Sequence, residues 1–248
     1  EPFMSPHYDI ASVSPPSRVA TWLELRAPLD WASLLFGAPK LARAPRGDGR
    51  PVLLIPGYRT DESSMRPLRR YLEFLNYDVY DWGRGRNMGD VESYVKHVGD
   101  FAQEIHRDVG EQAVTLVGWS LGGVIARETA RLNPDVVREV ITMGTPVIGG
   151  PKYTAVADRF AKISGIDLDE FEKEVHERNL LGIEQPVTAI YSKTDGVVGW
   201  RACIDSYNAH ARNIEVNCSH FGLGANSRVW RIIAEALAPK LDEAPANA

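Results

Sequence analysis

The most informative segment of the sequence is VGWSLGG at residues 117–123, which contains the pattern G-x-S-x-G around Ser120. An apolar run, AVTLVG, leads into the segment, and a helical pattern, LGGVIARETARL, leads out of it. Between a strand and a helix, small residues on both sides of a serine allow a sharp turn that exposes the hydroxyl at the helix N-terminus. The pattern therefore predicts that Ser120 is a nucleophile. A tight structural turn with an incidental serine is the alternative.

A serine nucleophile needs a base to take its proton, and His220 is the histidine that we expect to do so. His220 lies in EVNCSHFGLG, directly after the last predicted strand, and so at the same end of the sheet as Ser120. His210 is the rival, but it precedes that strand, so we expect it at the opposite end.

The base in turn needs an acid that orients it, and Asp195 is the candidate because it follows a predicted strand in YSKTDGVVGW. Asp205 lies further along the same segment and is the weaker candidate. Asp167 and Asp169 belong to a helical region, where aspartate commonly caps a helix N-terminus. The resulting chain order of serine, aspartate and histidine is the one that accompanies a G-x-S-x-G turn.

Two backbone N–H groups are expected to stabilise the oxyanion that forms when Ser120 attacks a carbonyl group. One belongs to Leu121, directly after the nucleophile. The other belongs to Tyr58, which follows LLIPG in the loop after the first predicted strand.

A second loop at this edge of the sheet is DWGRGRNMGD, residues 81–90, which follows the second predicted strand. Its three glycines lack the spacing of a dinucleotide-binding turn, so a nucleotide is not predicted here. We interpret the loop as a wall of the substrate pocket, with Asn87 and Met88 facing the substrate.

The elements that must position these residues alternate between strands and helices. Short β-rich runs lie at residues 51–55, 77–81, 113–118, 138–143, 186–191 and 213–217, and helical patterns lie at residues 65–75, 91–109, 121–132 and 227–237. Alternation of this kind predicts an α/β fold, with about six mainly parallel strands and helices on both faces of the sheet.

Two regions stand outside this alternation. Residues 147–185 form a long connection with two helical patterns, at 152–163 and 167–180, and we expect a small helical cap over the strand ends. Residues 1–50 are expected to form a helical arm that packs on the main domain, residues 51–248, with Pro28 and Gly37 dividing the arm into short pieces. Its apolar residues suggest an arm near a lipid-facing entrance: Trp22, Trp31, Leu34, Leu35 and Phe36.

The composition limits the classes of function. The chain has 248 residues, 44% of them hydrophobic and 25% charged, which is typical of a globular protein. Its net charge of −5 argues against a nucleic-acid partner, and no apolar run is long enough to span a bilayer. The histidines show no metal-binding spacing. No apolar leader is visible, which favours a cytoplasmic location unless a leader was removed before Glu1; the oligomeric state is not predicted.

Five segments together resemble the serine lipases and esterases of the α/β-hydrolase fold: LLIPGY, VGWSLGG, ITMGTPVIGG, SKTDGVV and CSHFGLG, spanning residues 53–224. The resemblance implies that a Ser120–His220–Asp195 triad hydrolyses carboxylic esters with a hydrophobic acyl group through an acyl-enzyme, with no cofactor. Trp119, Pro146 and Val147 are then expected in the substrate pocket. Trp119 stands where these enzymes often have histidine, so the resemblance does not predict which ester is the substrate.

Two other functions fit the same residues. An acyltransferase or thioesterase would use the same triad with a different acceptor or leaving group. A non-catalytic ligand-binding module would usually lack an intact triad.

The resemblance also suggests a disulfide between Cys203 and Cys218, as in some bacterial lipases. Such a bridge would tie the Asp195 loop to the His220 loop and stabilise the fold by roughly 3 kcal/mol for a loop of about 15 residues. It would also indicate export of the protein. The alternative is two buried thiols in a reducing compartment.

Overall fold

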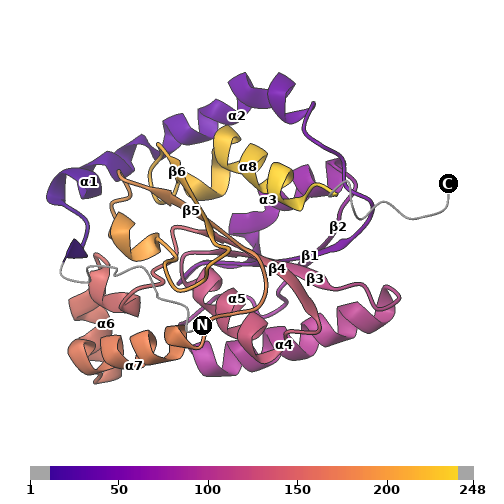
Figure 1. Ribbon diagram of the computed structural model, residues 1–248. Coiled ribbons are helices and arrows are strands. Elements are labelled where there is room, and N and C mark those ends of the chain that lie inside the picture. Colours follow the sequence, from indigo (N-terminus) through magenta and orange to yellow (C-terminus); the bar gives the residue numbers. More distant parts are fainter. Residues whose placement is uncertain (1–11, 240–248) are drawn as a thin grey trace.

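The computed structural model describes residues 12–239, and its centre is a single six-stranded sheet (Figure 1). The strands are β1 (Pro51–Ile55), β2 (Asp78–Asp81), β3 (Val114–Trp119), β4 (Val137–Met143), β5 (Val187–Ser192) and β6 (Arg212–Val216). Their order is β2-β1-β3-β4-β5-β6, and every pairing is parallel. Each strand lies within one residue of its predicted position at both ends.

Helices cover both faces of the sheet. In Figure 1, α4 (Val91–Asp108) and α5 (Leu121–Leu132) lie below it, and α3 (Glu62–Phe74) and α8 (Ser227–Leu237) lie above it. Successive β1 residues point to opposite faces: Leu53 and Ile55 pack with α4 and α5, whereas Val52 and Leu54 pack with α3 and α8. The predicted α/β architecture is thus confirmed. No helix among residues 12–239 is long and apolar enough to cross a membrane.

The connection between β4 and β5 contains a 3-10 turn, η3 (Gly150–Tyr153), and two helices, α6 (Ala157–Ser164) and α7 (Leu168–Leu180). Both helices lie together at the lower left of Figure 1. α7 begins where Asp167 accepts hydrogen bonds from the N–H groups of Asp169 and Glu170, at 2.8 and 3.0 Å. α6 starts five residues later than predicted because η3 occupies the preceding segment.

The N-terminal part of the described chain contains α1 (Arg18–Leu23), a 3-10 turn η2 (Glu24–Arg26) and α2 (Ala27–Leu41). The break predicted at Gly37 was wrong, whereas the one predicted at Pro28 lies next to the junction of η2 and α2. Pro28 lies in the first turn of α2, where its missing N–H costs nothing. Gly37 lies inside the helix, and a Cβ at this position would collide with Ser227 at the start of α8. Gly37 therefore allows close packing of α2 on α8 instead of ending the helix.

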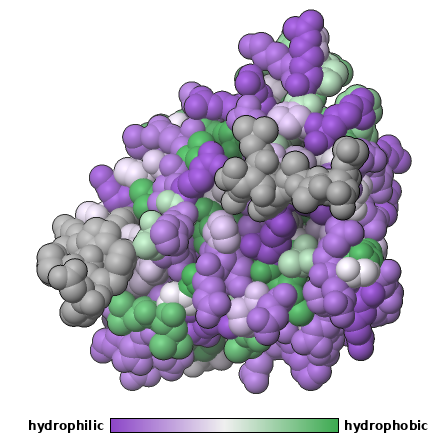
Figure 2. Space-filling model, turned by 45° about the vertical axis from the view of Figure 1, so that its right-hand side comes forward, coloured by the Kyte–Doolittle hydropathy of each residue, from purple (hydrophilic) through white to green (hydrophobic). Residues whose placement is uncertain are grey.

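The surface is largely hydrophilic on the face in Figure 2, where hydrophobic residues form separate areas. The arm differs, because it carries seven of the large hydrophobic side chains that are exposed: Val19, Trp22, Leu25, Leu29, Trp31, Leu35 and Phe36. Leu34, which the sequence analysis grouped with them, instead packs partly buried against the core between the sheet and α8.

Candidate active site

Ser120 lies in the turn between β3 and α5. Its backbone has φ 53° and ψ −120°, a left-handed conformation that non-glycine residues seldom adopt. The Ser120 N–H donates to the carbonyl of Met143 at 2.7 Å, and the Thr145 hydroxyl donates to the Ser120 carbonyl at 3.0 Å. Both bonds come from the end of β4, so the neighbouring strand holds the strained turn in place.

The glycines around Ser120 are required by close backbone approach. A Cβ at Gly118 would overlap the carbonyl of Gly122, and a Cβ at Gly122 would overlap the carbonyl of Ile55 in β1. At Gly123 a Cβ would collide with the Thr145 side chain. The spacing in G-x-S-x-G thus reflects the tight fit of α5 against β1, β3 and the end of β4.

His220 and Asp195 form a buried pair beside this turn. Their side chains are 4% and 0% exposed, and Nδ1 of His220 lies 2.6 Å from Oδ2 of Asp195. The other carboxylate oxygen of Asp195 accepts the N–H groups of Val197 and Val198, at 2.8 and 2.7 Å. These two hydrogen bonds fix the orientation of the Asp195 carboxylate, so that its other oxygen faces Nδ1 of the imidazole.

Opposing effects act on the pKa of His220. Burial disfavours the imidazolium and lowers the pKa, whereas the charge and hydrogen bond of Asp195 and the charge of Glu24 raise it. The raising effects are larger in sum, so the pKa of His220 lies above its usual value of 6.5. A carboxylate that stabilises the protonated ring is what a general base requires when it takes a proton.

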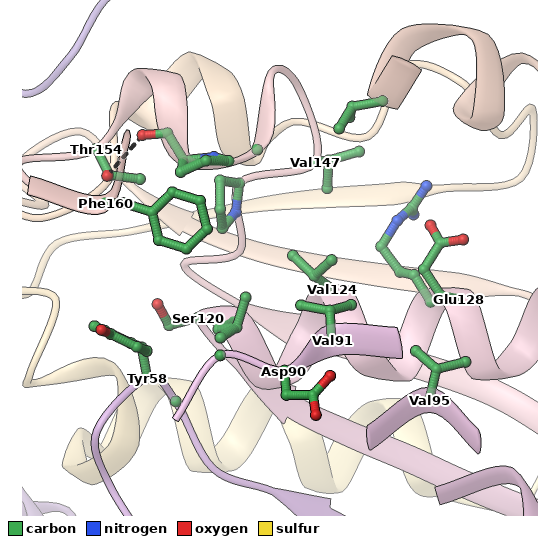
Figure 3. A pocket seen from close by; sticks show the side chains of 18 of the residues that line it. Tyr58, Asp90, Val91, Val95, Ser120, Val124, Glu128, Val147, Thr154 and Phe160 are labelled. Carbon is green, nitrogen blue, oxygen red and sulfur yellow. Dashed lines mark hydrogen bonds between the residues drawn. The ribbon is translucent and has the colours of Figure 1, made fainter. Parts of the chain in front are cut away.

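Ser120 and His220 both line one large pocket, of about 1530 Å³. The pocket lies between α4 and α5 on one side and the β4–β5 connection on the other. In Figure 3, Val91 and Val124 lie between Ser120 and Glu128, with Val147 above them and Val95 below Glu128. Phe160 of α6 and Tyr58 lie on either side of Ser120 in the same view. Trp119 and Pro146, both expected near the substrate, also line this pocket.

The two expected oxyanion donors lie beside Ser120. Tyr58 and Leu121 both line the pocket, and Leu121 is the first residue of α5. Within residues 12–239, the backbone N–H of neither residue donates to a protein acceptor. Leu121 is at a helix start, where an N–H group has no partner within the helix, and Tyr58 lies in the loop between β1 and α3; both N–H groups are thus open to an added acceptor.

Two residues of the loop at 81–90 were expected in the pocket, and only one of them, Met88, lines it. Met88 is 56% exposed and lines the pocket. Asn87 is fully buried and does not line it: its side-chain amide donates to the carbonyl of Pro56 at 2.9 Å, and its backbone bonds Arg59 and Thr60. A polar side chain buried in this way is held by its hydrogen bonds. Asn87 therefore fixes the Tyr58 loop from behind and does not face the substrate.

The rival residues have other surroundings. Asp205 is buried against the guanidinium of Arg127, an ion pair between α5 and the segment after η4 (Trp200–Cys203). His210 is exposed and precedes β6, so it lies at the opposite end of that strand from His220. Neither residue lines the pocket that contains Ser120.

The expected disulfide is absent, because Cys203 and Cys218 are both free and buried. Cys203 packs with Ile148, Tyr153 and other residues on the cap side, whereas Cys218 packs in the core between the sheet and α8. The two thiols thus belong to different apolar clusters. Burial raises the pKa of both thiols far above the ordinary value, which disfavours the thiolate. No group of three or more metal-ligating side chains occurs in the described part of the chain.

Two acidic residues of the arm, Glu24 and Asp30, were not predicted to lie near the site. Glu24 accepts a hydrogen bond from the His220 N–H, and Asp30 accepts one from the Ser219 N–H, at 2.7 and 3.0 Å. The sequence carries no signal for these contacts, because they join residues almost 200 positions apart.

Comparison with solved structures supports the fold. The chain is similar to the Bacillus licheniformis lipase BlEst2, with 16% identity, a TM-score of 0.60, and 79% of this chain and 95% of that chain covered. It is also similar to a Paleococcus ferrophilus monoacylglycerol lipase, with 17% identity, a TM-score of 0.58, and coverage of 78% and 95%. At such identities the likeness concerns the fold alone.

A curated relative matches a shorter segment. The poly(3-hydroxyalkanoate) polymerase subunit PhaC of Allochromatium vinosum is 31% identical over 118 residues, which are 42% of this chain. The match spans about a third of that relative's length, 32%. The model of the alpha/beta hydrolase family matches residues 52–245, from β1 to beyond α8. The chain therefore belongs to the alpha/beta hydrolase family.

Proposed function

We propose that the protein is a serine hydrolase that cleaves carboxylic esters through an acyl-enzyme. One observation carries the proposal: Ser120, in a strained strand-to-helix turn, lines the same pocket as His220, whose Nδ1 lies 2.6 Å from the buried Asp195 carboxylate. This combination of nucleophile, base and orienting acid recurs in acyl-transfer enzymes of unrelated folds.

In the proposed reaction, the Ser120 oxygen attacks the ester carbonyl while Nε2 of His220 takes the hydroxyl proton. The N–H groups of Tyr58 and Leu121 stabilise the oxyanion, and Asp195 stabilises the imidazolium. The C–O bond to the alcohol then breaks, and His220 gives its proton to the leaving oxygen. Water, deprotonated by the same histidine, attacks the acyl-enzyme and releases the acid.

The pocket wall supports a hydrophobic acyl group. The side chains at 120, 124 and 128 are spaced by four residues, so they lie along one face of α5 over about 12 Å. Val91 and Val124 lie between Ser120 and Glu128 in Figure 3. An acyl chain bound along this face would bury its methylene groups against apolar carbon, which favours binding by about 0.8 kcal/mol for each group.

A fluorophosphonate probe tests the nucleophile. It should label the wild type, fail to label Ser120→Ala, and label Ser63→Ala, whose exposed serine lies at the start of α3, as fast as the wild type. On p-nitrophenyl esters, Ser120→Ala and His220→Ala should each lower kcat by about 10⁶-fold. Labelling of Ser120→Ala at the wild-type rate would refute the assignment.

Acyl transfer is a second candidate, supported by the similarity to a protein whose name identifies it as a polymerase of 3-hydroxyalkanoates. The same acyl-enzyme would form, and an alcohol or hydroxyacyl group would replace water as its acceptor. Product analysis separates the two: the enzyme is given a simple ester, 3-hydroxybutyryl-CoA and an excess of alcohol together. Free acid as the dominant product supports hydrolysis, and a new ester or oligomer supports transfer.

We also propose that the arm contacts an anionic lipid surface. Residues 12–46 contain two acidic residues, Glu24 and Asp30, and both face the active-site loops. The same stretch contains five basic residues, of which four are exposed: Arg18 in α1, Lys40 in α2, and Arg43 and Arg46 after α2. Apolar side chains flanked by cations on a helix surface favour binding to a membrane with anionic lipids.

A further inference from the structure

Glu24 of η2 connects the two loops that carry Asp195 and His220. One of its carboxylate oxygens accepts the N–H groups of Gly196 and His220, both at 2.7 Å. The other accepts the N–H of Phe221 at 3.2 Å. A single side chain thus binds backbone groups directly next to the acid and at the histidine itself.

Asp30 of α2 holds the histidine loop from a second position. Its side chain is 7% exposed, and its Oδ2 accepts the N–H and the hydroxyl of Ser219, at 3.0 and 2.8 Å. Its Oδ1 accepts the side-chain amide of Asn226 at 3.2 Å. Asn226 also caps the N-terminus of α8, so Asp30 links the histidine loop to the start of that helix.

Two glycines make these contacts sterically possible. A Cβ at Gly196 would overlap the carbonyl of Ala20, and a Cβ at Gly222 would overlap the carboxylate of Asp30. Neither glycine has a positive φ, so their small size, and not an unusual backbone conformation, is what the site requires. The Thr21 hydroxyl adds a hydrogen bond to the carbonyl of Gly196 at 3.2 Å.

We infer that the N-terminal arm is a working part of the active site, with Glu24 and Asp30 as positioning residues that hold the His220 and Asp195 loops in register. This inference rests on the proposed serine-hydrolase function. Neither carboxylate lines the substrate pocket, so both act through the loops and not on the substrate.

The two residues differ in their effect on the base. Two acidic groups face His220 and raise its pKa, Asp195 and Glu24, while burial lowers it. Asp30 contacts the neighbouring Ser219 and is not among the groups that shift the pKa of His220. Loss of the Glu24 charge should therefore change both the position of the His220 loop and the pKa of His220. Loss of the Asp30 charge should change only the position of the loop.

Glu24→Gln is the main test, because the amide keeps the size of the side chain but turns a donor toward one of the three N–H groups. We expect kcat on a p-nitrophenyl ester to fall by about 10- to 100-fold, since a small misplacement of catalytic groups is costly. KM should change less than about twofold, because Glu24 does not contact the pocket. The acid limb of the pH–rate profile should move to lower pH.

Asp30→Asn is the second test, in case Glu24→Gln folds poorly. It should lower kcat while leaving the acid limb at its wild-type position. Glu235→Gln is the matched control, because Glu235 is an exposed partner of Arg231 on α8 at 2.7 Å and belongs to neither loop. It should keep the wild-type kcat, KM and pH profile.

Each outcome decides the inference. The inference is overturned if both variants keep the wild-type kcat. It is also overturned if their loss of activity matches the loss of folded protein, measured by circular dichroism, and the acid limb of the pH–rate profile is unchanged. Failure of the proposed function has a different signature, since it would appear as fluorophosphonate labelling of Ser120→Ala. If Ser120→Ala is not labelled and Glu24→Gln keeps the kcat and pH profile of the wild type, only the role of the arm is rejected.

Discussion

At the scale of single residues, the site depends on how His220 is surrounded. The imidazole is buried, yet the Asp195 and Glu24 carboxylates more than compensate for the burial, so its pKa is raised. A general base works in its neutral form, so the proposed role of His220 implies that activity falls as the pH decreases through this raised pKa.

The first prediction concerns this pH dependence. The acid limb of kcat/KM should have its midpoint above 6.5, the usual pKa of histidine. The contribution of His220 to stability has the opposite sign: it is fully present below the pKa of the unfolded chain and is lost as the pH rises through the higher folded pKa. Initial rates and urea unfolding over the same pH range measure both, and an acid limb below 6.5 would contradict the prediction.

The second prediction separates two adjacent residues of the loop at 81–90. Asn87→Ala removes the hydrogen bond to Pro56 behind the Tyr58 loop, so it should lower kcat by up to about 10²-fold and stability by about 1–3 kcal/mol. Met88→Trp should alter the preference for acyl-chain length, because Met88 lines the pocket, while fluorophosphonate labelling continues. Equal effects of both changes on chain-length preference would show that Asn87 reaches the substrate after all.

At the scale of elements, α5 connects the turn at Ser120 to the cap, residues 147–185. Ser120 precedes its first turn, and Val124 lines the pocket from its next turn. Arg127 also lines the pocket; it is 2% exposed and pairs with Asp205, and its second nitrogen lies 3.4 Å from Asn179 of α7. Asn179 in turn donates to the carbonyl of Val147 at 2.8 Å. Arg127 thus connects α5 to the segment after η4 through Asp205, and to the cap through Asn179.

The third prediction tests this connection. Arg127→Met leaves the Asp205 carboxylate buried without its cation, so the free energy of unfolding in urea should fall by about 3–5 kcal/mol. Arg231→Met is the control, because its pair with Glu235 is half exposed, and it should cost less than about 1 kcal/mol. A loss for Arg127→Met no larger than that of the control would show that the pair does not anchor α5.

At the scale of the whole molecule, charge is distributed unevenly. The chain carries a net charge of −5, yet residues 12–46 of the arm hold five basic residues and only two acidic ones, Glu24 and Asp30, which both face inward. Figure 1 shows α1 and α2 along the upper edge of the molecule, with α2 outside α8. If the arm binds lipid, the same helices that hold the catalytic loops would rest on the membrane surface.

The fourth prediction concerns this surface. The protein should float with vesicles that contain phosphatidylglycerol more strongly than with pure phosphatidylcholine, and added salt should weaken the binding. A Trp22→Ser, Phe36→Ser double variant should lose it, and Arg18→Gln should lose about 1 kcal/mol. Leu180→Ser, at an exposed apolar residue of α7, is the control. Equal flotation with both lipids, or a dimer that the double variant abolishes, would exclude the lipid role.

Much of the fold could be read from local patterns. The six strands and the helices α4, α5 and α8 lie close to their predicted positions, because alternation of apolar residues and turn signals depend on near neighbours. The order of Ser120, Asp195 and His220 along the chain also brought them to one edge, since parallel strands all end there. The break predicted at Gly37 was wrong because packing on α8 outweighs local preference.

By itself, the sequence determined the layered sheet, the turn at Ser120 and the edge at which the candidate residues meet, all of which follow from short-range patterns. Only the tertiary structure decided that Asn87 is buried, that the two cysteines stay apart and that Glu24 and Asp30 reach the loops of Asp195 and His220. The last of these outcomes depends on which buried N–H groups lack a nearby acceptor. The acceptors came from the arm, nearly 200 residues away, at a distance along the chain that no local pattern encodes.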